Sequence, residues 1–138
     1  MKTVGYSGTP LAKKLGIKEG FLIKVVNGPE YYFKLFTDLP DVKISKASIE
    51  LDFIHYFAKT KSALVKDLPV LKKQIAEDGM IWVSWYKKAA NIPTDVTEDV
   101  IRDFALKIGL VDIKVCAVDE LWSGLKLVIP VKERRLKD

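Results

Sequence analysis

Two adjacent lysines, Lys87 and Lys88, follow the apolar stretch 80–86, and Asp95 lies further along the same connection. An apolar stretch that ends in charged residues is typical of a buried strand whose end reaches solvent. Ligands of open α/β sheets bind beyond the carboxyl ends of the strands. We therefore predict that Lys88 pairs with a small anionic or nucleotide-like ligand, that Lys87 assists it, and that Asp95 organises the loop.

A second candidate feature is the sequence W-S-G at 122–124, which has the composition of a hairpin turn. If this turn folds beside the loop that carries Lys88, Trp122 forms a flat apolar wall for the ligand and Ser123 contributes to it. The alternative is that Trp122 fills an edge of the core, that Ser123 serves only the turn, and that the lysines are solvated. Both interpretations stay open, because pockets need few polar groups and loops supply many by chance.

His55 is the only histidine, so a pair of histidines cannot bind a metal ion here. On a strand it shares one face with Leu51, Phe53 and Phe57, which favours a core histidine with satisfied hydrogen bonds over a general base. Asp52 points to the other face. If the protein is an enzyme, His55 or Asp52 is the candidate acid or base; we assign no catalytic residue.

The single cysteine, Cys116, lies in a strand-like segment without a base nearby in the sequence. This favours an inert small side chain over a nucleophile. One cysteine forms neither an internal disulfide nor the cysteine half of a zinc site, so we expect a reducing compartment and no metal. With no signal peptide and no apolar run of roughly 20 residues, we predict a cytoplasmic protein that does not associate with a membrane.

Two glycine-containing turns are candidates for binding phosphate or a cofactor. The stretch NGPE, 27–30, follows the first strand, where a dinucleotide or methyl-donor fold carries a glycine-rich loop, yet G-x-G-x-x-G is absent. The stretch GYSGTP, 5–10, lacks the G-K-[ST] ending of a P-loop, and Pro10 removes an N–H donor. We therefore expect no cofactor of these kinds and an entry turn at 5–10, with Ser7 and Thr9 as capping or turn groups.

The chain carries a net charge of +5, with 23 basic and 18 acidic residues. The positive charge is mostly lysine spread among acids, and the arginines are only Arg102, Arg134 and Arg135. Arginine is favoured for reading bases, so we do not expect specific binding of nucleic acid. A length of 138 residues and an apolar share of 49% fit one soluble globular domain, residues 1–138, whose residues 132–138 form a basic tail.

The elements that position these residues alternate between strand and helix. A short helix, capped by Thr9 and ended by Gly16, makes residues 1–20 an N-terminal lid. Strands are expected at 21–26, 41–45, 51–58 and 80–86, and a helix led by Pro29 follows the first. Leucines and Ile75 mark a helical face over 60–78, which Gly79 ends and which Pro69 kinks or splits.

The last helix is expected to begin at a capping box of Asp95 and Glu98 and to stop at Gly109. The stretches 111–118 and 124–131 follow, too close for a parallel crossover, so they pair as an antiparallel hairpin. Alternation places Asp112 and Lys114 together on one face. The sum is a three-layer Rossmann-like α/β fold with a mostly parallel sheet and a C-terminal antiparallel hairpin, as in methyltransferases, but short, with a reduced first half.

Three stretches resemble an uncharacterised bacterial family, a domain of unknown function. They are GYSGTPLAKKLGIK at 5–18, GMIWVSWYKKA at 79–89, and LVDIKVCAVDELWSGLKLV at 110–128. The resemblance spans nearly the whole chain and implies membership without supplying chemistry. Members of that family often carry W-P-K-K where this chain has Tyr86. Tyrosine keeps a backbone donor that proline lacks, so the geometry that presents Lys87 and Lys88 differs.

Three functions stay open. The first is a binding or regulatory domain for a small anionic ligand. The second is a transferase-type enzyme on a reduced methyltransferase-like scaffold. The third is an interaction module that binds another protein through an aromatic surface of Tyr31, Tyr32 and Phe36.

Overall fold

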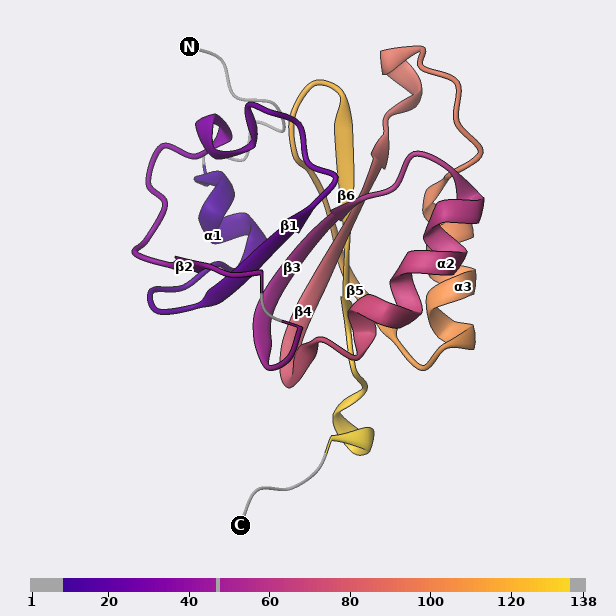
Figure 1. Ribbon diagram of the computed structural model, residues 1–138. Helices are drawn as coiled ribbons and strands as arrows, with labels where there is room; N and C mark the ends of the chain where they lie inside the picture. Colours follow the sequence, from indigo (N-terminus) through magenta and orange to yellow (C-terminus); the bar gives the residue numbers. More distant parts are fainter. Residues whose placement is uncertain (1–8, 47, 135–138) are drawn as a thin grey trace.

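The computed structural model describes residues 9–46 and 48–134 (Figure 1), which form a six-stranded sheet in the order β2-β1-β3-β4-β6-β5. The strands are β1 Leu22–Val26, β2 Lys43–Ile44, β3 Leu51–Phe57, β4 Ile75–Tyr86, β5 Val111–Ala117 and β6 Trp122–Val128. The first four in chain order pair in parallel, while β6 pairs antiparallel with both β4 and β5. The predicted fold class is confirmed.

Helices cover both faces of the sheet, which gives the three layers that the sequence predicts. Figure 1 shows α1 (Leu11–Leu15) on one side of the sheet and α2 (Lys61–Lys72) with α3 (Glu98–Lys107) on the other. Short 3₁₀ turns complete the connections: η1 (Tyr32–Leu35), η2 (Lys88–Ala90) and η3 (Val131–Glu133). No helix among the described residues has the length and apolar character needed to cross a membrane.

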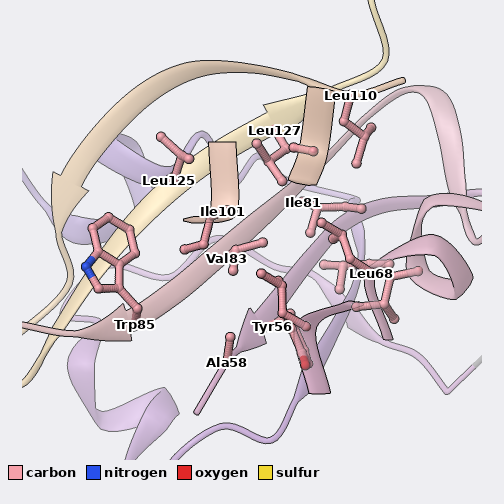
Figure 2. Packing of buried hydrophobic residues seen from close by; sticks show 14 of the residues in the cluster. Tyr56, Ala58, Leu68, Ile81, Val83, Trp85, Ile101, Leu110, Leu125 and Leu127 are labelled. Atoms are coloured by element: carbon pink, nitrogen blue, oxygen red, sulfur yellow. The ribbon is translucent and has the colours of Figure 1, made fainter. Parts of the chain in front are cut away.

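The larger core lies between the sheet and the helices α2 and α3. Figure 2 shows Leu68 of α2 and Ile101 of α3 packed over Ile81 and Val83 of β4, with Leu125 of the neighbouring strand. All five side chains are fully buried. Full burial of such a side chain contributes about 1.5–3 kcal/mol, so this layer supplies much of the stability.

A smaller core lies under α1. Leu15 of α1 packs with Ile23, Phe53 and Trp82 from three neighbouring strands. The indole Nε1 of Trp82 donates a hydrogen bond of 2.8 Å to the backbone oxygen of Leu15, so the buried indole keeps a polar partner where the helix ends. Gly16 then stops the helix at φ 82°, as predicted.

The predicted helix over 60–78 is wrong at its end. The helix α2 stops at Lys72, and Ile75 begins β4. Gly79 lies inside that strand, where a Cβ would come within 2.7 Å of the backbone oxygen of Leu51, so the glycine permits close strand contact. Pro69 lies inside α2 and does not split it, and Leu64, Leu68 and Leu71 of this helix are buried.

Two other predicted helix features are wrong. The helix led by Pro29 is reduced to η1, which begins at Tyr32. Helix α1 has Pro10 as its N-cap residue and no side-chain cap, so Thr9 does not cap it. Ser7 lies outside the described residues, as does most of the basic tail; within the described part, the Nε of Arg134 donates to the backbone oxygen of Ile129 at 3.0 Å.

The C-terminal hairpin differs from its prediction in two details. Strand β6 starts at Trp122, so W-S-G forms its first residues rather than the turn. In β5, Asp112 pairs with Leu127 whereas Lys114 pairs with Lys126, which leaves Ile113 as the extra residue of a β-bulge. Cross-strand partners share a face, so the bulge puts Asp112 and Lys114 on opposite faces and the predicted alternation is wrong.

Candidate functional site

The switch point of the sheet lies at the carboxyl end of β1. The chain leaves β1 to form β2 on one side and β3 on the other, and ligands of open α/β sheets bind where the strand order reverses in this way. Asn27 leaves the strand at φ 58°, as the predicted turn requires. A Cβ on Gly28 would lie 2.6 Å from Cγ1 of Val25, so the turn returns closely over its own strand.

Tyr32 of η1 is buried beside this switch point, where it packs on Val25 of β1 and on β3. Its side chain is only 2% exposed, and its ring meets His55 and Phe57 of β3 edge to face at centroid distances of 5.2 and 5.8 Å. Its hydroxyl lies 2.9 Å from Nδ1 of His55. The aromatic surface expected for an interaction module therefore lacks Tyr32, which belongs to the core.

His55 is fully buried and hydrogen-bonded at both ring nitrogens. Nε2 lies 2.7 Å from the hydroxyl of Ser84 on β4, and Nδ1 contacts Tyr32. Hydroxyls donate or accept, so a neutral imidazole is satisfied in either tautomer. Burial lowers the pKa of His55 to about 3. The prediction of a satisfied core histidine is confirmed, and His55 is not poised as a general base.

Asp52 does not complete an acid and base pair with His55. Its carboxylate accepts a hydrogen bond of 2.8 Å from the backbone N–H of Leu22 on the adjacent strand. It therefore ties β3 to the start of β1, at the opposite end of the sheet from the switch point. His55 is thus buried, and the partly exposed Asp52 is engaged by a backbone N–H.

Trp122 is a core residue at the edge of the sheet. Its side chain is 3% exposed, stacked on Tyr86 at a centroid distance of 4.1 Å and edge-on to Phe57 at 4.9 Å. It thus fills a core edge and does not present an open wall. Ser123 pairs with Trp85 and Ala117 within the sheet. For Trp122 this is the structural alternative that the sequence left open, whereas Ser123 lies in the strand and not in the turn.

Lys87 and Lys88 lie at the carboxyl edge of the sheet, as the sequence predicts for the end of a strand. The backbone N–H of Lys87 donates to the oxygen of Leu121 at 2.8 Å, which closes the β4–β6 ladder, and Lys88 starts η2 with its side chain exposed. Because β3 and β4 are paired, Lys59 and Lys61 after β3 share this edge. We call these four residues the lysine rim; whether they bind a ligand stays a prediction.

Asp95 fastens two loops of this edge together. Its carboxylate accepts a hydrogen bond of 2.7 Å from the backbone N–H of Lys61, and the Thr94 hydroxyl donates to the oxygen of Lys59 at 2.8 Å. The predicted capping role in its own helix is wrong: Thr97 is the N-cap of α3 and accepts from the N–H of Val100. Asp95 instead organises the connection between β4 and α3 by capping the first residue of α2.

Sequence reasoning missed two residues of this site, Tyr32 and Ser84. Ser84 is the one small polar residue in the apolar run 80–86, and a lone polar residue in a buried strand needs a partner. Tyr32 gave no comparable signal, since its burial depends on how η1 folds back. No cluster of histidine, cysteine or acidic side chains that could hold a metal ion occurs in residues 9–46 and 48–134.

No family model and no curated protein matches this chain. Solved structures do match its fold. A protein from Sulfolobus solfataricus assigned to the type 11 methyltransferases has 16% identity and a TM-score of 0.62, over 91% of this chain and 93% of that one. A SAM-dependent methyltransferase from Aquifex aeolicus has 15% identity and a TM-score of 0.57, over 87% and 88%.

A third match is the magnesium protoporphyrin IX methyltransferase of Synechocystis PCC 6803 with bound SAM. It has 9% identity and a TM-score of 0.56, over 87% of this chain and 74% of that one. At such low identities the likeness shows the fold alone. The chain has the three-layer fold of SAM-dependent methyltransferases. Its chemistry must be argued from its own residues.

Proposed function

We propose that this protein is a ligand-binding domain built on the methyltransferase fold and that it recognises a small anionic or nucleotide-like ligand at the lysine rim. Lys88 is the main charge partner and Lys87 assists it. Asp95 holds the connection that carries them against the loop after β3. The observation that carries the proposal is the burial of Tyr32 beside the end of β1, together with the exposure of Lys88 at the outer edge of the sheet.

The residues at the switch point do not fit the methyl donor that the fold implies. Tyr32, held by His55 and Phe57, occupies the crevice where an open α/β sheet receives its ligand. The turn after β1 has one glycine, and its backbone already approaches Val25 closely. A cofactor placed there would have to displace a buried aromatic ring, whose loss from a core costs about 3–5 kcal/mol.

The lysine rim supports an anion by charge. Lys59, Lys61, Lys87 and Lys88 follow two adjacent strand ends, and in the described part of the chain none forms an ion pair with a carboxylate. Ammonium groups bind phosphate or carboxylate through charge-assisted hydrogen bonds. Asp95, the nearest acid along the connection, is engaged by a backbone N–H.

Titration with ADP, followed by amide chemical shifts, tests this function. We expect saturable shifts at residues 87–90 and about 10-fold weaker binding in Lys88→Ala, the loss of one hydrogen bond to a charged group. Lys107→Ala, an exposed lysine on α3, is the matched control and should bind as the wild type does. Equal affinities in Lys88→Ala and wild type, with both folded, would rule out the rim.

A transferase is the second candidate, because the fold is shared with SAM-dependent methyltransferases. Methyl transfer needs a bound donor in line with a nucleophile more than it needs an acid and base pair. Space for the donor therefore decides between the two functions. Transfer of labelled methyl groups from SAM to molecules of a cell extract would favour the transferase over the binding domain. This transfer should be lost in a variant that changes the switch point and stays folded.

A further inference from the structure

A cleft lies between α1 and the edge strand β5, away from the lysine rim and outside the function proposed above. It has a volume of about 620 Å³. Its lining residues come from the stretch just before α1, from α1 itself and from the end of β5: Thr9, Lys13, Lys14, Lys114, Val115, Cys116 and Ala117. Three of the lining side chains are lysines and none is acidic. We call it the lysine cleft.

The β-bulge at Ile113 is what brings Lys114 to this cleft. Without it, Lys114 would share a face with Asp112, which pairs with Arg102 of α3 on the other side of the sheet. With it, Lys114 stands directly opposite Lys126 on the α1 face. Like charges placed opposite each other destabilise a sheet, and bulges often re-aim side chains at functional sites.

Hydrogen bonds hold the ammonium groups at the cleft. Nζ of Lys114 donates to the backbone oxygen of Lys14 at 2.9 Å, and Nζ of Lys14 approaches the oxygen of Ala117 at 3.5 Å. Among the residues that the structure describes, no carboxylate forms an ion pair with these lysines. Burial lowers the pKa of Lys126, and the charges of Lys114 and Lys18 lower it further. The repulsion is therefore not balanced by acidic side chains.

We propose that the lysine cleft binds a phosphorylated small molecule, whose phosphate groups lie between Lys13, Lys14 and Lys114 with Lys126 behind them. A group with two or more negative charges offsets the repulsion that the bulge creates, which a single carboxylate does only in part. Two positioned backbone contacts limit the freedom of the lysines, so less side-chain entropy is lost on binding.

Cys116 provides a built-in reporter of this site. The thiol lies in the cleft and is half-buried, and burial raises its pKa while Lys14 and Lys114 partly oppose that rise. A bound phosphate both covers the thiol and neutralises the two lysines that favour its thiolate. Reaction of Cys116 with a disulfide reagent should therefore slow when the cleft is filled, because the thiolate is the reactive form.

The experiment titrates the protein with inorganic pyrophosphate and follows both calorimetric binding and the rate of Cys116 modification. We expect saturable binding, and at least about 5-fold slower modification of Cys116 at saturation. In Lys114→Gln, binding should weaken about 10-fold, in line with loss of a hydrogen bond to a charged group. The variant should stay folded in a thermal melt, since it removes a like-charge contact.

Two controls make the outcome specific. Lys107→Ala on α3 should retain pyrophosphate binding. Both Lys107→Ala and the rim variant Lys88→Ala should retain the protection of Cys116, which reports on the cleft alone. The cleft proposal is overturned if pyrophosphate gives no saturable binding, or if Lys107→Ala weakens it as much as Lys114→Gln does. Because the rim is tested with Lys88→Ala and ADP, failure of one site is distinguishable from failure of the other.

Discussion

Helices of 12 and 10 residues, α2 and α3, cover one face of the sheet, whereas the other is covered by the five-residue α1, the turn η1 and loops. The helical face is closed mainly by aliphatic side chains, with Tyr56 and Trp85 among them (Figure 2). The other face holds the two buried polar side chains of the described chain, His55 and Ser84, and both lie in one hydrogen-bonded chain with Tyr32.

The two faces differ in how strictly they specify their side chains. An aliphatic layer tolerates exchange of similar side chains, whereas a buried polar chain is satisfied by only one arrangement of its members. Tyr32 reaches its place from a 3₁₀ turn, and the hydrogen bond to His55 fixes it there. Tyr32 is thus held beside the switch point by a specific hydrogen bond as well as by apolar packing.

Of the substitutions that test this comparison, we expect Tyr32→Ala to have the largest effect on stability. Removal of a fully packed aromatic side chain costs about 3–5 kcal/mol of unfolding free energy. Tyr31→Ala, its half-buried neighbour, should cost less, and Ile101→Ala tests the helical face. Only Tyr32→Ala should raise the pKa of His55 toward its usual value, measured by NMR. A similar rise in Ile101→Ala would show that the faces are not independent.

The next effect is expected from Ser84→Ala. It leaves Nε2 of His55 buried without a partner, which costs about 1–3 kcal/mol. Ser123→Ala is the matched control, a half-buried serine on β6 that should change stability by less than about 0.5 kcal/mol. Denaturant midpoints measure both variants. Equal midpoints for the two would mean that the polar chain does not stabilise this face.

The pH dependence of the free energy of unfolding should also reflect the buried, neutral His55. The unfolded chain binds a proton at His55 near pH 6.5, whereas the folded chain stays neutral until about pH 3. Protons therefore favour the unfolded state, and stability present above pH 6.5 is lost as the pH falls through that window. Between pH 7 and pH 5 the loss is roughly 2 kcal/mol. The slope should vanish in His55→Asn; if it persists there, another group is responsible.

The smallest effect concerns the helix caps. Thr97→Ala should cost about 1 kcal/mol and speed hydrogen exchange in the first turn of α3. Asp95→Ala should instead speed exchange at the N–H of Lys61, the first residue of α2. If Asp95→Ala instead speeds exchange first in α3, then Asp95 caps α3 as the sequence predicted.

Much of the fold could be predicted from local sequence. The alternation of strands and helices and the short link before β6 determined the class, because a parallel crossover needs more residues than the link contains. Gly16 and Gly109 marked helix ends correctly, both at positive φ. These features depend on neighbours in the chain, which is why the pattern reveals them.

The candidate site was less predictable because its contacts join distant segments. Asp95 looks like a cap for the helix that follows it, yet it binds an N–H of α2, more than thirty residues earlier. Ile113 fits a regular alternation, and only pairing with β6 shows the bulge. Trp122 is equally suited to a pocket or a core, and its stacking on Tyr86 decides for the core.

The central claim is that Tyr32, His55 and Ser84 seal the switch point. The most direct test records the ring ¹⁵N signals of His55 from pH 7.5 to pH 4.5, with and without millimolar SAM. The account predicts a neutral imidazole throughout, with signals that SAM does not move. A titration near pH 6.5, or a saturable shift on addition of SAM, would contradict it.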